Sequence, residues 1–128
     1  MKALSWKKIC CPVDAEPTSR AGLEAAVDLA RRFGAELTLL HVRTAGAAEP
    51  GHAAEWRTEA EQAGVPVARA EVEGEPERAI ADYVNGHAFD LVVMGTHART
   101  GRPHMLTGSV AESTVRLAHC PVMVVQQP

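Results

Sequence analysis

The chain has 128 residues, of which 46% are hydrophobic and 23% charged, and its formal net charge at pH 7 is −3. This length suits one domain over residues 1–128, and the composition is close to that of ordinary globular proteins. The net negative charge argues against a nucleic-acid partner, and no apolar stretch approaches the roughly 18 residues of a membrane span.

Short apolar runs, typical of strands buried on both faces, alternate with apolar stripes at helical spacing. In chain order we expect a strand at 9–13, a helix at 17–33, a strand at 37–42, a helix at 53–63, a strand at 65–72, a helix from Pro76 to Val84, a strand at 91–94, a helix at 109–118 and a strand at 122–125. The third strand is more polar than the others, so we place it at an edge. The alternation predicts an α/β fold, with a parallel sheet wrapped on both faces by right-handed crossovers.

The segment from Gly95 to Ser109 has an unusual composition. It contains three glycines, several hydroxyls, Arg99, Arg102 and two histidines, but no acidic residue, although the protein is acidic overall. It leads into the predicted helix at Gly108-Ser109, and a helix N-terminus with nearby glycines favours bound anions. These features indicate a phosphate site, although the segment matches neither a P-loop nor the GxGxxG of dinucleotide folds.

The same segment is similar to the signature of the universal stress protein family, G-x-x-G-x9-G-[S/T]. Gly95, Gly108 and Ser109 match it, and Ala98 stands where the signature has its second glycine. Further blocks resemble the family in the right order along almost the whole chain: Cys11 to Asp14, Arg31 to Val42, Asp90 to His97 and Cys120 to Val125.

The resemblance implies a doubly wound five-stranded sheet with strand order 3-2-1-4-5 and a homodimer joined through the last strand. It also implies ATP over the point where the strand order reverses, with AMP or ADP as alternatives and Mg²⁺ as a counter-ion. Asp14 would contact the adenosine, Val42 would border the adenine, and the glycine loop with Ser109 would hold the phosphates. The expected nucleotide-binding residues are Pro12, Val13, Asp14, Val42, Met94, Gly95, Ala98, Arg99, Gly108, Ser109 and Val110. We expect Ala98 to weaken ATP binding without abolishing it.

Several of these residues have a structural alternative. Asp14 could cap a helix or turn instead of touching a ligand. Ser109 begins a capping box with Glu112, a role that can coexist with phosphate binding. The histidines in the last third of the chain match no metal-ligand spacing, so we predict no metal site formed by side chains. The cysteines have the pattern of core residues in a reducing compartment, which favours a cytoplasmic location.

The favoured function is a stress-response or regulatory protein that binds ATP. The alternative is a dimeric interaction module of the same family that binds no nucleotide. An enzyme is the weakest hypothesis, because the sequence offers no catalytic triad, no HExxH and no paired catalytic carboxylates. We therefore expect slow ATP hydrolysis at most.

Overall fold

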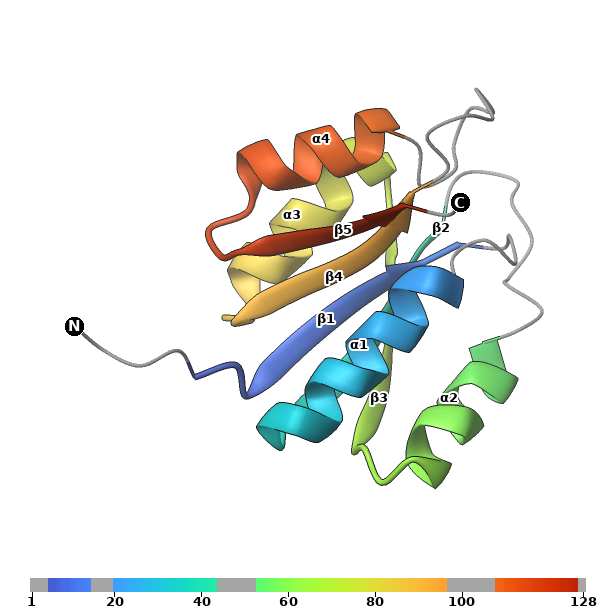
Figure 1. Ribbon diagram of the computed structural model, residues 1–128. Coiled ribbons are helices and arrows are strands. Elements are labelled where there is room, and N and C mark those ends of the chain that lie inside the picture. The colour runs from blue at the N-terminus through green and yellow to red at the C-terminus, as the bar shows by residue number, and fades with distance from the viewer. Residues whose placement is uncertain (1–4, 15–19, 44–52, 97–107, 127–128) are drawn as a thin grey trace.

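A computed structural model of the chain describes residues 5–14, 20–43, 53–96 and 108–126. Within these ranges the elements are β1 (Lys8–Val13), α1 (Arg20–Phe33), β2 (Glu36–Arg43), α2 (Ala53–Gln62), β3 (Val67–Glu73), α3 (Pro76–Gly86), β4 (Leu91–Thr96), α4 (Gly108–Leu117) and β5 (Val122–Gln126). The strands lie in the order β3-β2-β1-β4-β5, and every neighbouring pair is parallel. The predicted sheet is confirmed, with helices on both of its faces (Figure 1).

The central strands are buried on both sides because their apolar runs supply side chains to two separate cores. Ile9, Cys11 and Val13 of β1 pack in a cluster with α1 and α2, whereas Cys10 packs in a second cluster with α3 and α4. Successive side chains of a strand point to opposite faces, so a run without polar interruption is what this position requires.

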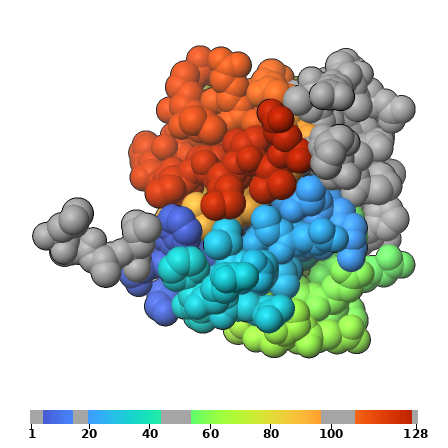
Figure 2. All heavy atoms as spheres, viewed as in Figure 1, coloured from blue at the N-terminus to red at the C-terminus, as the bar shows by residue number. Residues whose placement is uncertain are grey.

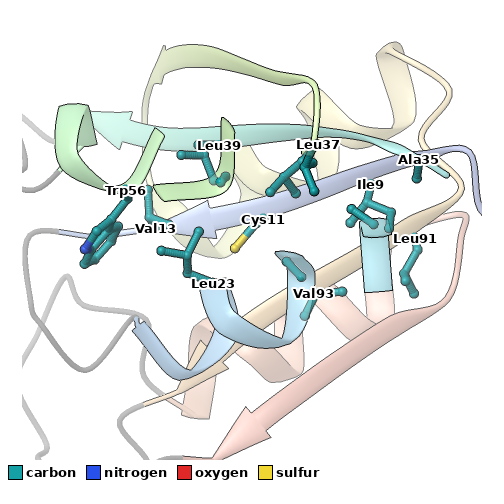
Figure 3. Packing of buried hydrophobic residues seen from close by; sticks show 14 residues of the cluster. Ile9, Cys11, Val13, Leu23, Ala35, Leu37, Leu39, Trp56, Leu91 and Val93 are labelled. Carbon is teal, nitrogen blue, oxygen red and sulfur yellow. The ribbon is translucent and has the colours of Figure 1, made fainter. Parts of the chain in front are cut away.

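The first cluster attaches the short helix α2 to the sheet. Trp56 is only 3% exposed and lies beside Val13, Leu23 and Leu39 (Figure 3). Removing it would leave α2 with little apolar area, because Ala60 is its other residue in the cluster.

The two edges of the sheet differ in polarity. β3 forms one edge and is mostly exposed or half-buried, as its more polar sequence predicts. β5 forms the other edge and is also partly exposed, but its sequence is apolar: Met123 and Val124 are each 36% exposed.

The two adjacent cysteines are buried and electrically neutral. Burial raises the pKa of the Cys11 thiol from 9.0 to about 12, and burial also raises the pKa of Cys10. Cys120 is half-buried, and partial burial raises its pKa as well. Because the thiolate is the reactive form, the two buried thiols should be chemically inert.

We therefore expect a thiol reagent such as DTNB to modify at most Cys120 in the native protein at pH 8, and all three cysteines after denaturation. Rapid modification of three thiols without denaturant would contradict this packing.

Because the folded state raises these pKa values, the buried thiols contribute their full stability below pH 9. That stability is lost as the pH rises toward about 12, the folded pKa of Cys11.

Candidate functional site

The order of the strands reverses between β1 and β4. The chain leaves β1 for α1 on one face of the sheet and leaves β4 for α4 on the other face. The register between β1 and β4 pairs Ile9 with Leu91 and Cys10 with Val92, whereas β1 and β2 stay in register through Val13. Neighbouring strands whose crossovers diverge in this way form the usual ligand crevice of open parallel sheets.

Several predicted site residues share one face at this crevice. Val42 and Met94 pack in the cluster formed with α3 and α4, and Pro12 lies on the same face because it follows Cys10 by two residues. Asp14 directly follows β1 and is only 9% exposed. Val13 differs from these residues, because its side chain packs toward α1 and α2. Its main chain is the part of Val13 that can face the crevice.

The end of β4 departs from the sequence-based prediction. Gly95 and Thr96 belong to the strand, paired with Val125 and Gln126 of β5, and are not the start of a loop. The pairing with β5 overrides the low strand propensity of glycine. Ala98 and Arg99, two of the predicted nucleotide contacts, lie outside the described residues.

Gly95 also has a structural role that the sequence did not reveal. Gly22 of α1 sits directly against it: a Cβ on Gly22 would lie 2.3 Å from the Gly95 nitrogen and 2.8 Å from the Met94 carbonyl carbon. Such distances are possible only because position 22 has no side chain. Helix α1 therefore rests on the backbone from which the predicted phosphate loop departs. The one available signal was a glycine inside an otherwise regular helical pattern.

The N-terminus of α4 lies at the same edge, because this helix follows β4 and returns the chain to the start of β5 (Figure 1). The helix begins at Gly108, one residue earlier than predicted, so Ser109 lies in its first turn. Val110 is fully buried in the same cluster as Met94. Its predicted role as a ligand contact is thus limited to its main chain.

Gly108 has a different environment from Gly22. A Cβ built on Gly108 would meet no other part of the described structure within 4 Å, and its φ is not in the left-handed region. Packing among the described residues therefore does not require glycine at this position. The first turn of α4 also contains no acidic residue. Free space, exposed amides and the helix dipole together suit an anion at this end of the helix.

Another pocket at the same edge lies on the opposite face. Its volume is about 330 Å³, and it is lined by Val13, Leu39, His41, Arg57, Arg69, Ala70 and Glu71. The His41 Nδ1 is 3.6 Å from the Glu71 carboxylate, which also contacts Arg43. Except for Ala70, which packs in the same cluster as Val42 and Met94, the lining residues are on the α2 side of the sheet, and we assign this pocket no ligand.

Comparison with known proteins decides the family. The model of the universal stress protein family matches residues 5–126. The chain belongs to the universal stress protein family. It is 32% identical to universal stress protein MJ0531 of Methanocaldococcus jannaschii in an alignment 142 positions long, which covers 96% of this chain and 84% of that protein.

Solved structures share the fold of this universal stress protein. The structure of MJ0577, also from Methanocaldococcus jannaschii, has a TM-score of 0.81 at 24% identity and covers 97% of this chain and 98% of its own. An Arabidopsis thaliana family member with AMP bound has a TM-score of 0.70 at 20% identity, covering 95% and 92%. The Archaeoglobus fulgidus universal stress protein in complex with dAMP has a TM-score of 0.68 at 21% identity, covering 94% and 98%.

No helix among the described residues is both long enough and apolar enough to cross a membrane.

Proposed function

We propose that this universal stress protein is a stress-response regulator that binds ATP in the crevice between β1 and β4, with AMP and ADP as alternative ligands. The observation that carries the proposal is that the half-buried Val42 and the main chain at Pro12 and Met94 lie on the same face and at the same end of the sheet as the N-terminus of α4. An apolar side chain beside main-chain polar groups suits an adenosine, and the N-terminus of a helix suits phosphates. Mg²⁺ would then act as a counter-ion to the phosphates.

Two further observations support this proposal. Gly108 leaves space at the first turn of α4 that packing within the described residues does not fill. Family members from Arabidopsis thaliana and Archaeoglobus fulgidus have been crystallised with AMP and dAMP. We assign Asp14 to the adenosine, because it is buried at the end of β1 rather than within the phosphate end of the crevice.

The direct test is to denature the purified protein by heat and to separate the released small molecules by chromatography. We expect an adenine nucleotide in the supernatant, and we expect 1 mM ATP to raise the melting temperature of protein from which the nucleotide has been removed. Protein that releases no nucleotide and whose melting temperature is unchanged by ATP, ADP or AMP would contradict the proposal.

The exposed apolar side chains of β5 favour a second proposal, a homodimer joined through this strand. β5 is an edge strand, Met123 and Val124 are each 36% exposed, and Val115 of α4 is 54% exposed. In Figure 2 the red atoms of β5 lie at the surface between α4 and α1. An apolar edge of this kind is a site of association. It would also serve an interaction module that binds no nucleotide.

Light scattering should therefore give twice the chain mass of 13.7 kDa at micromolar concentration. We expect Val124→Lys to yield a monomer, because a lysine ammonium would be desolvated in the interface. Gln62→Lys on the exposed side of α2 is the matched control and should leave the dimer intact. A monomeric wild-type protein, or a dimer in both variants, would exclude β5 as the interface.

A further inference from the structure

Thr96, the last residue of β4, has a buried hydroxyl that finds no hydrogen-bond partner among the described residues. The residue is only 3% exposed, and its Oγ1 is hydrogen-bonded to none of the residues that the structure describes. A buried hydroxyl that loses its bonds to water and gains none costs free energy. Such groups are rare in folded proteins, and each one calls for an explanation.

Another threonine on the same side of the sheet shows how this cost is usually avoided. Thr114 in α4 is fully buried, and its hydroxyl donates to the Val110 carbonyl at 2.9 Å, one turn earlier in the helix. Thr96 cannot bond in this way, because it is in a strand, paired with Gln126 of β5, and has no carbonyl one helical turn earlier. The neighbouring backbone therefore does not offer the Thr96 hydroxyl the kind of acceptor that Thr114 uses.

The pleat of β4 places Thr96 on the face covered by α4. Val92 and Met94 pack in the cluster that contains Val110 and Ala111 of the first turns of α4, and Thr96 is two residues beyond Met94. It is also at the carboxyl end of the strand, which is the end where α4 begins. The unpartnered hydroxyl and the N-terminus of α4 thus lie at the same end and on the same face.

We propose that the Thr96 hydroxyl binds a phosphate oxygen of the nucleotide, completing an anion site whose other donors are the main-chain amides at the start of α4. This inference rests on the proposed function. A hydroxyl can donate one hydrogen bond to an anionic oxygen, and bonds to charged acceptors are stronger than those between neutral groups. The bound phosphate would supply the partner that the described part of the chain does not.

Thr96→Val tests this role, because valine keeps the branched shape and removes only the hydroxyl. We expect the affinity for ATP to fall about tenfold or more, while the melting temperature of the nucleotide-free protein stays the same or rises. Thr96→Ser keeps the hydroxyl and should bind ATP within about threefold of wild type, and so should the control Thr114→Val, which removes a hydroxyl already bonded to the helix. Adenosine, which has no phosphate, should bind equally to wild type and Thr96→Val.

The possible results are distinguishable. If wild type binds ATP and Thr96→Val binds it equally well, the inference is wrong and the proposed function stands. Equal losses of ATP and adenosine would place the hydroxyl at the nucleoside and overturn the phosphate assignment. A lower melting temperature for nucleotide-free Thr96→Val would show that the hydroxyl has a structural partner, which also overturns the inference. If wild type binds no nucleotide, the proposed function fails, and this inference fails with it.

Discussion

Gly22→Ala should destabilise the protein by about 2 kcal/mol or more, although alanine is the better helix former. The added Cβ would lie 2.3 Å from the Gly95 nitrogen and 2.8 Å from the Met94 carbonyl carbon, and neither backbone atom can rotate away. Overpacking of this kind costs about 3 kcal/mol, against about 1 kcal/mol gained in helix propensity. Denaturant unfolding of the nucleotide-free protein measures the difference.

Gly86→Ala is the matched control for this prediction. Gly86 is also helical, at the end of α3, but a Cβ there would meet nothing within 4 Å. This variant should be as stable as wild type or more stable by up to about 1 kcal/mol. If both variants change stability by the same amount and sign, the contact between α1 and β4 is not as tight as the structure describes. Because α1 rests on Gly95, we also expect Gly22→Ala to weaken nucleotide binding.

Ser109→Glu should reduce ATP affinity about a hundredfold without destabilising the fold. A carboxylate about 5 Å from a phosphate would repel it by roughly 3 kcal/mol at an effective dielectric constant near 20, which corresponds to about two decades in affinity. The same carboxylate would interact favourably with the helix dipole, because the first turn of α4 has no acidic residue. Affinity and stability should therefore change in different directions, as titration calorimetry and thermal melting can measure.

Ser109→Gln separates charge from size in this experiment. Glutamine has nearly the same volume as glutamate, and it removes the same serine hydroxyl, so we expect it to lose about tenfold in affinity or less. The difference between the two variants should shrink as salt is added, because salt screens charges that are accessible to solvent. Equal ATP affinities for the two variants would mean that the phosphates do not lie near the start of α4.

The alternation of apolar runs and helical stripes is sufficient to predict the parallel sheet and the position of most elements, and the polar third strand predicts one of its edges. Strands buried on both faces need uninterrupted apolar residues, as in Leu91 to Met94, so this signal is local and easily seen. The strand order came from the resemblance to the family, and the structure confirms it.

The features that the sequence did not predict depend on contacts between distant segments. Gly22 and Gly95 are far apart in the chain, and a glycine within a helical pattern does not indicate which backbone it contacts. The apolar run predicts a strand that ends at Met94, whereas pairing with β5 keeps Gly95 and Thr96 in the strand as well. Its unpartnered hydroxyl could be recognised only after the packing around it was known.

Titration of nucleotide-free protein with ATP, followed by competition with GTP, is the most direct test of the adenine nucleotide site. The crevice between β1 and β4 predicts saturable binding of one ATP per chain, which GTP at the same concentration does not displace. Binding of ATP and GTP with equal affinity would contradict an adenine-specific site, and the absence of binding by ATP, ADP and AMP at millimolar concentrations would contradict the nucleotide site altogether.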